Sequence, residues 1–305
     1  MAVSAPQRTV GGSDVGAILG LSPFKTKLDV WRGLVLHDRD NTESPAMALG
    51  HRFEAPVLDA YRRTLPEGSE VNKPPMVVRG WRRASVDSIA TIDRWRRIVE
   101  AKTTAHGDDW GETGTDQVPL HYQTQCLWYM DLYEIDETDV PVLIWPEPYK
   151  ARELLGLAPA EIVETLGIKV LRVDYNKALA DKIRSEVEAF WTDHVEAQVP
   201  PAPVDLADAK RNWWAATGKT IEAEPRLIEL LLEHDKIKQA ADEIEGRKEA
   251  SEFELRRLIG DAETVTRDGK PIVSLKTTTR AAYTAQVAET KYRSLRTLKA
   301  WKTAQ

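Results

Sequence analysis

The sequence contains very little cysteine and no long apolar run. Its 305 residues include one cysteine, Cys126, which excludes an internal disulfide and a multi-cysteine metal site and fits a reducing cytosol. No apolar stretch approaches the roughly 18 residues that a membrane-spanning helix needs. Residues 1–8 lack the apolar core of a secretory signal. We therefore expect a cytoplasmic protein with no membrane association.

Positive charge is also in deficit. Lys and Arg number 42 against 48 Asp and Glu, for a formal net charge of −6, which argues against a protein that coats nucleic acid non-specifically. The hydrophobic share of 42% and the charged share of 30% are ordinary for a soluble globular protein. Any contact with nucleic acid therefore has to come from a local basic surface.

A proline-rich segment divides the chain. Residues 199–203 are Val-Pro-Pro-Ala-Pro, a composition typical of linkers. We predict a main domain over residues 1–199, a linker over residues 200–204 and an appendage over residues 205–305.

The appendage is predicted to be helical and then to form a hairpin. Residues 225–260 favour one coiled-coil-like helix, or a pair of helices with a break near Gly246 and Ser251. Asp268-Gly269 in an alternating segment predicts a β-hairpin. Residues 280–302 form a basic tail that is either a solvated face or a DNA contact. The heptad rows are Leu230, Ile237, Ile244 and Leu258, with Leu227, Ala241 and Leu255 as a second row.

The main domain alternates between helical and strand periodicity. An N-cap at Ser13 or Asp14 predicts a short first helix, and Pro119 in a first-turn position predicts the start of another. This alternation favours an α/β fold. Helices are expected over residues 46–64, 119–133, 160–166 and 177–196, and strands over residues 76–78, 83–91, 97–104, 140–145 and 168–175.

One of these strands ends in charged residues. Ile98 and Val99 are apolar, and Glu100 and Lys102 follow two positions apart, so their side chains project to the same side of a strand. Buried charges are costly unless they neutralise each other or hold an ion. Asp87 ends a similar segment upstream and can reach the same point. Converging carboxylates and a lysine suit a hard divalent cation beside a phosphate.

Each of these residues also has a simpler interpretation. Glu100 and Lys102 alone fit a solvated ion pair on a strand, and Glu54 alone fits a surface helix position. Ser13 alone fits an N-cap, and Tyr129 fits a core position. Their joint occurrence in order decides between the two interpretations.

The order of the motifs resembles a known family. Over residues 8–200 the chain is similar to the YqaJ-type viral recombinases, which are related to lambda exonuclease and belong to the PD-(D/E)xK nuclease superfamily. The motifs are Gly11-Gly12-Ser13-Asp14, Gly50-His51-Arg52-Phe53-Glu54, Asp87, Glu100-Ala101-Lys102-Thr103-Thr104 and Gln125-x-x-x-Tyr129.

The resemblance implies roles for the matching acids and lysine. Asp87 and Glu100 would ligate Mg²⁺, with the Ala101 carbonyl as a further ligand and Glu54 binding directly or through water. Lys102 would orient or deprotonate the attacking water and offset charge on the scissile phosphate.

Four further residues are implied in contacts with DNA or phosphate. Gln125 would contact the active site or DNA, and Tyr129 shares its helix face one turn later. Ser13 would hold a phosphate at a helix N-terminus, and Arg8 would contact a 5′-phosphate.

The implied protein is a Mg²⁺-dependent deoxyribonuclease, with Mn²⁺ as a substitute, in the cytoplasm of a bacterial host. It would degrade double-stranded DNA ends from 5′ to 3′ and leave 3′ overhangs for phage-type homologous recombination. The implied fold is an α/β restriction-endonuclease-like core with a central mixed sheet flanked by helices. The implied partners are a single-strand annealing protein and further copies of the chain, since family members can form rings around DNA.

Two other classes of protein stay open. One is an endonuclease or another nuclease of the superfamily, although the absence of a cysteine set argues against an iron–sulfur Cas4-like enzyme. The other is a non-catalytic DNA-binding or assembly protein that uses the heptad helix as its interaction surface.

Overall fold

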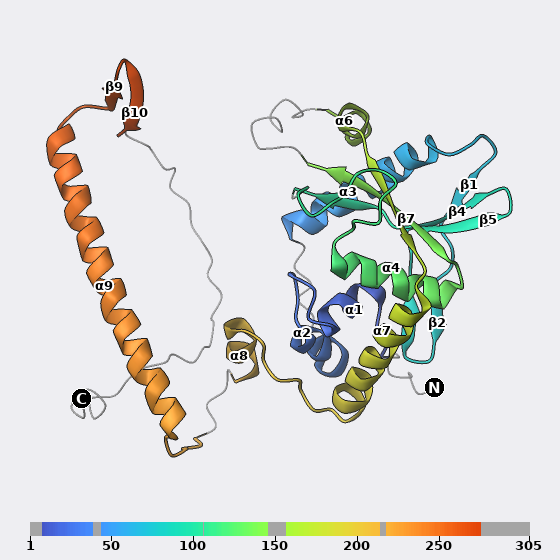
Figure 1. Cartoon of the computed structure of the whole chain (residues 1–305), viewed down its shortest axis with the longest axis horizontal. Helices are drawn as coiled ribbons and strands as arrows, with labels where there is room; N and C mark the ends of the chain where they lie inside the picture. Colours follow the sequence, from blue (N-terminus) through green and yellow to red (C-terminus); the bar gives the residue numbers. More distant parts are fainter. Residues whose placement is uncertain (1–7, 39–43, 106, 146–156, 214–217, 276–305) are drawn as a thin grey trace, which may run out of the picture. The chain divides into compact units, whose positions relative to one another are not determined.

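The chain forms two compact units, residues 1–212 and 213–305 (Figure 1). The computed structural model describes residues 8–38, 44–105, 107–145, 157–213 and 218–275. No helix in these ranges combines the length and the apolar character that crossing a membrane requires.

A six-stranded mixed sheet forms the centre of the first unit. The order is β1-β4-β5-β7-β6, and β8 also pairs with β7. β7 runs parallel to β5 and β6, and the remaining pairs are antiparallel. The strands are β1 (Glu70–Asn72), β4 (Ser88–Ile92), β5 (Trp95–Val99), β6 (Lys102–Thr104), β7 (Glu137–Ile144) and β8 (Lys169–Asp174).

Helices cover both faces of this sheet (Figure 1). α3 (Pro45–Arg62) and α6 (Pro159–Leu166) lie on one face, and α4 (Leu120–Tyr133) lies on the other with α1 (Gly12–Ile18) and α7 (Lys177–Phe190) packed against it. The predicted α/β architecture with a mixed sheet between helices is therefore confirmed. The smaller helices of this unit are α2 (Lys27–Trp31), α8 (Leu206–Asn212) and the π-helical turns η1 (Arg32–Leu36) and η3 (Trp191–Glu196).

Alternation along β7 assigns its residues to the two faces. Val140 and Val142 belong to the same core cluster as the residues of α4. Leu143 packs with Phe53 of α3, and Asp139 accepts a hydrogen bond from the Tyr61 hydroxyl of α3. This period-two pattern is the one expected of a strand buried on both sides.

The predicted strand over residues 83–91 is wrong as a single element. β3 (Arg82–Ala84) pairs with β2 (Val77–Arg79) in a separate two-stranded sheet, whereas β4 joins the main sheet. The chain changes sheets at residues 85–87. Asp87 therefore lies in a connection rather than at the end of a strand.

The predicted strand over residues 97–104 is interrupted at Glu100 and Ala101. The register with β7 is the same on both sides of the interruption, because Val99 pairs with Asp139 and Lys102 with Val142. Between these pairs β7 contains Pro141, which has no N–H to donate to a neighbouring strand. The constant register keeps Glu100 and Lys102 on the same side, as predicted.

The predicted linker lies within the first unit. α8 follows it and contacts the start of α2, where the Thr26 hydroxyl donates to Asp208 at 2.9 Å and Arg211 forms an ion pair with Asp29. Asp208 is fully buried. These polar contacts account for a division of the chain after Asn212 rather than near residue 200.

The second unit contains one long helix and a hairpin. α9 (Pro225–Ile259) is continuous through Gly246 and Ser251, where a break was considered, and none of its residues is buried. β9 (Thr264–Arg267) and β10 (Lys270–Ser274) pair around Asp268 and Gly269, both with positive φ, which confirms the predicted hairpin. The predicted basic tail, residues 280–302, lies outside the described residues.

Candidate active site

The carboxylate of Glu100 is the centre of the candidate site. Its Oε1 accepts a hydrogen bond from Lys102 Nζ at 2.8 Å and another from Gln125 Nε2 at 2.7 Å. Glu100 is buried, and the Lys102 side chain is largely enclosed. Three of the residues singled out in the sequence therefore meet, although 25 residues separate Glu100 from Gln125 in the chain.

Helix α4 supplies one wall of this site. Gln125 and Tyr129 are one turn apart, and Gln125 Nε2 also donates to the Tyr129 hydroxyl at 2.9 Å. The amide oxygen of Gln125 lies 3.4 Å from Lys102 Nζ. Gln125 thus contacts both Glu100 and Lys102, and it fixes the orientation of the Glu100 carboxylate.

Asp87 lies beside the same centre. Ser88 pairs with Val99 across β4 and β5, so the preceding Asp87 is level with Glu100. Its Oδ2 accepts a hydrogen bond from the Ala101 N–H at 2.9 Å. Burial, and next the negative charge of Glu100, raise the pKa of Asp87 to about 7. The fold therefore places the carboxyl groups of Asp87 and Glu100 close together, and this favours the neutral form of Asp87.

Glu54 approaches the site from α3. Its charge also raises the pKa of Asp87, which places it within electrostatic range of that carboxyl. Its own carboxylate is partly exposed and lies 3.9 Å from Lys73 Nζ. Glu54 is thus on the solvent side of the site, while Glu100 is on the buried side.

Tyr122 is a further residue of the candidate site, and the sequence analysis did not single it out. Lys102 Nζ lies 4.6 Å from the centre of the Tyr122 ring, in range of a cation–π contact. Burial alone would lower the pKa of Lys102, but the neighbouring Glu100 carboxylate outweighs it, so the pKa is raised and the ammonium stays charged. Tyr122 precedes Gln125 by three residues, and this spacing on α4 was the available signal.

The donor set fits a hard divalent cation in its chemistry. Glu100 Oε2 is buried and has no hydrogen-bond partner in the described part of the chain, and a buried carboxylate oxygen without a partner is rare in folded proteins. Asp87 and Glu54 are further oxygen donors of the kind Mg²⁺ prefers. Among the described residues, however, no three acidic, histidine or cysteine side chains are grouped so that they could hold a metal ion as they stand.

Arg8 and Ser13 do not join this cluster. No described hydrogen bond or ion pair connects either residue to Glu100, Asp87 or Lys102, and Ser13 is exposed. The prediction that Ser13 or Asp14 caps the first helix is wrong. Gly11 is the N-cap, and Asp14 is the third residue of α1, where its Oδ2 accepts from the Gly11 N–H at 2.9 Å.

Two glycines allow α1 to lie directly against α4. A β-carbon at Gly12 would come within 2.3 Å of Tyr129 Cε1, and one at Gly16 within 2.9 Å of His121 Cβ. The two glycines are four residues apart and therefore share a helix face. The close packing of α1 thus supports the ring of Tyr129. Tyr129 in turn holds Gln125 in place.

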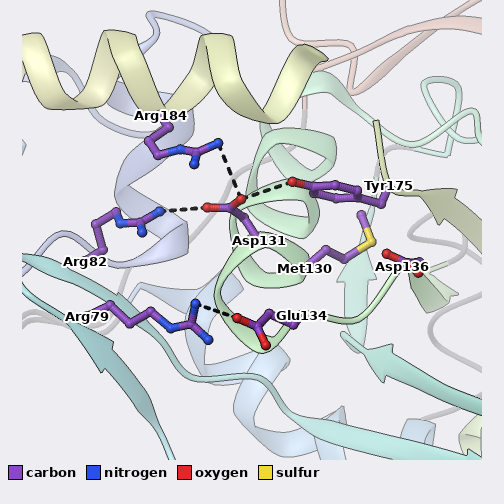
Figure 2. A pocket seen from close by; sticks show the side chains of 8 residues that line it. All are labelled: Arg79, Arg82, Met130, Asp131, Glu134, Asp136, Tyr175 and Arg184. Atoms are coloured by element: carbon purple, nitrogen blue, oxygen red, sulfur yellow. Dashed lines mark hydrogen bonds and ion pairs between the residues drawn. The ribbon is translucent and has the colours of Figure 1, made fainter. Parts of the chain in front are cut away.

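A separate cavity of about 350 Å³ opens around the C-terminal end of α4 (Figure 2). At its centre Asp131 accepts from Arg82 at 2.7 Å and from Tyr175 at 3.0 Å, and lies 3.6 Å from Arg184. These charges neutralise one another, so the cavity has the features of a structural ion network. Its lining residues are Arg79, Arg82, Met130, Asp131, Glu134, Asp136, Tyr175 and Arg184.

An acid pair, a charged lysine and a glutamine at an interrupted strand of a mixed sheet are features of a hydrolytic centre that handles phosphate. Comparison with known families agrees with this class, because the YqaJ-like viral recombinase domain matches residues 4–135. Residues 4–135 are thus similar to the YqaJ-like viral recombinase domain, and the predicted resemblance to this lambda exonuclease-like family is confirmed.

Solved structures show more distant likenesses. An alkaline exonuclease from Laribacter hongkongensis is 15% identical, with a TM-score of 0.45, over 63% of this chain and 89% of that one. A phage-related exonuclease from Haemophilus somnus is 15% identical, with a TM-score of 0.46, over 63% of this chain and 96% of that one. No curated protein matches the chain.

Proposed function

We propose that this protein is a metal-dependent deoxyribonuclease that degrades double-stranded DNA from its ends. The observation that carries the proposal is the buried Oε2 of Glu100, which has no partner among the described residues although it lies beside Lys102, Gln125 and a second carboxyl, Asp87. A buried carboxylate with one unpaired oxygen is energetically costly unless a positive charge lies nearby. A bound cation would supply that charge.

Four oxygen donors would hold the cation. Glu100 and Asp87 are the main ligands, Glu54 adds a carboxylate from the solvent side, and the Ala101 carbonyl adds a neutral oxygen. When bound, Mg²⁺, or Mn²⁺ in its place, would neutralise charge on the scissile phosphate and make a water molecule more acidic. The raised pKa of Asp87 fits this assignment, because a nearby cation would return that carboxyl to its charged form.

Lys102 and Gln125 would act on the substrate side. The charged Lys102 ammonium would stabilise the negative charge that develops on the phosphate during attack by water. Its raised pKa favours this electrostatic role over the alternative of removing a proton from water. Gln125 would keep the Glu100 carboxylate oriented through its 2.7 Å hydrogen bond.

The finer points of the proposal rest on the family resemblance. We infer 5′-to-3′ degradation that leaves 3′ overhangs for phage-type recombination, with Arg8 and Ser13 as contacts of the 5′-phosphate. A single-strand annealing protein and further copies of the chain, in a ring, are the proposed partners. Two structural neighbours described as exonucleases agree with this general class.

The test is digestion of a linear duplex with 5′-phosphates, carrying a label at either the 5′ or the 3′ end. We expect degradation with Mg²⁺, early release of the 5′ label, no digestion of a covalently closed circle, and no activity in EDTA. Lys102→Ala should abolish activity. The matched control is Lys177→Ala, because Lys177 is 78% exposed and pairs with Asp181 one turn further along α7 at 2.6 Å.

Each contrary outcome changes the proposal in a defined way. Cleavage of the closed circle would make the protein an endonuclease of the same superfamily. DNA binding without any cleavage at any divalent cation concentration would favour the non-catalytic assembly protein. Full activity of Lys102→Ala would remove the proposed centre altogether.

A further inference from the structure

Helix α9 carries an apolar stripe that nothing in the described part of the chain covers. The helix has 35 residues and none of them is buried. Ile237 and Ile244 are 60% and 62% exposed, in the middle of the helix. Helices of this length normally owe their stability to an apolar face that packs on another element. Among the described residues, the stripe therefore lacks an occupant.

The stripe has the heptad geometry of a coiled coil. Its two rows are three and four residues apart in alternation, which are the a and d positions of a heptad. Lys248 and Ser251 interrupt the rows once each near the C-terminal half, and His234 once near the N-terminal half. A polar residue at a single a position is a known means of fixing the register and number of strands. The a row is Leu227, His234, Ala241, Lys248 and Leu255, and the d row is Leu230, Ile237, Ile244, Ser251 and Leu258.

The charges beside the stripe are complementary to those of a second copy. In a parallel, in-register pair, each g position faces the e position five residues further along the partner helix. Glu233 then faces Lys238 of the second copy, and Arg247 faces Glu252. The remaining g positions, Arg226, Ala240 and Glu254, face Leu231, Glu245 and Ile259. Two of the five pairs attract and none repels.

We propose that α9 pairs with α9 of a second copy of this chain as a parallel, in-register coiled coil. The pairing buries the rows centred on Ile237 and Ile244 and places each Glu233 opposite a Lys238. The opposite side of the helix, which includes Phe253, stays exposed. Each assembly then carries two nuclease units joined through their C-terminal units.

The first test compares apolar substitutions on and off the stripe in the full-length chain. Light scattering coupled to gel filtration should give the mass of two chains, or of a multiple of two, for the unaltered protein. Ile237→Asp and Ile244→Asp should each halve that mass or weaken association by at least about tenfold. Phe253→Asp is the matched control, because Phe253 is 64% exposed and lies at an f position, so its mass should not change.

The second test is a charge exchange that addresses partner and register together. Glu233→Lys alone sets two lysines against each other in each of two symmetric pairs and should weaken the dimer. Adding Lys238→Glu restores opposite charges only if residue 233 faces residue 238 of the other copy, so the double variant should recover the dimer. Circular dichroism of each variant checks that α9 remains helical.

Three outcomes overturn the proposal. A monomeric unaltered chain at tens of micromolar would show that α9 has no second copy as its occupant. A mass that is the same for Ile237→Asp as for Phe253→Asp would place any self-association elsewhere. A double variant as weak as Glu233→Lys would exclude the parallel register. Digestion of linear duplex by the same variants separates these outcomes from failure of the nuclease proposal, because none of the substituted residues belongs to the Glu100 centre.

Discussion

Two buried carboxylates of the central sheet, Asp139 within β7 and Glu100 just after β5, have very different surroundings. Asp139 of β7 faces α3, where it accepts from the Tyr61 hydroxyl at 2.7 Å and from Arg172 at 2.9 Å, with Arg97 3.6 Å away. Both of its oxygens have partners. Asp139 therefore belongs to an ion network in which both of its carboxylate oxygens are paired.

Glu100 follows β5 and faces α4, on the opposite side of the sheet. One of its oxygens accepts from Lys102 and Gln125, and the other has no partner in the described structure. The comparison indicates how to separate structural charges from functional ones, because a network built for stability has no reason to leave an acceptor unmet. The following predictions test this distinction.

The largest expected effect is the loss of catalysis in Glu100→Gln. The substitution keeps the size of the side chain but removes the charge that would hold a cation, so cleavage of linear duplex should fall about a thousandfold. The free energy of unfolding in EDTA should fall by less than in Asp139→Ala, because Lys102 loses its counter-charge while Asp87 loses its repulsive neighbour. A variant that cleaved at the normal rate would show that Glu100 is as structural as Asp139.

Asp139→Ala should have the converse effect. It leaves Arg172, Arg97 and the Tyr61 hydroxyl without their shared acceptor, and breaking a buried charge network by removing one member costs about 3 kcal/mol. Urea unfolding followed by circular dichroism measures this loss. At a temperature where the variant is still folded, its cleavage rate should stay within a few-fold of the unaltered protein, in contrast to Glu100→Gln.

The two networks should also differ in their response to pH. Burial and the charge of Glu100 raise the pKa of Asp87 from 3.8 to about 7, so between these values the folded protein binds a proton that the unfolded chain has released. Stability in EDTA should therefore fall as pH rises from 4 to 7, by at most about 1.4 kcal/mol per pH unit. Asp87→Asn should lose this slope, and an unchanged slope would assign it to another group.

The smallest expected effect concerns the ring beside Lys102. A cation–π contact of about 1 kcal/mol depends on the aromatic face and not on the hydroxyl. Tyr122→Phe should therefore keep cleavage near its normal rate, whereas Tyr122→Leu should lower kcat about fivefold with little change in KM. Equal losses in both variants would point to the hydroxyl instead.

Much of the site could be predicted because its residues lie in short, recognisable motifs. Strand periodicity placed Glu100 and Lys102 on one side, and helical spacing placed Gln125 and Tyr129 on one face, and both relations hold in the structure. The hairpin at Asp268-Gly269 followed from a similar local signal, whereas the mixed sheet followed from the family resemblance. Local periodicity is reliable where a segment is buried in the way its pattern implies.

The remaining features depend on contacts between distant segments. The interruption at Glu100 and Ala101 coincides with Pro141, about 40 residues later, and the attachment of α8 depends on Thr26, about 180 residues earlier. The cation–π contact of Tyr122 depends on how α4 lies over β6. No window of sequence contains both partners of these contacts, so propensity and spacing could not predict them.

The close contact between α1 and α4 has a consequence for how the family can diverge. A β-carbon at Gly12 would overlap the ring of Tyr129, and one at Gly16 would crowd His121, so neither glycine can change without a matching change across the contact. Among relatives, positions 12 and 129 should covary, with a larger residue at one accompanied by a smaller residue at the other. An alignment of relatives would test this covariation separately from the inheritance of the acids and the lysine of the candidate site.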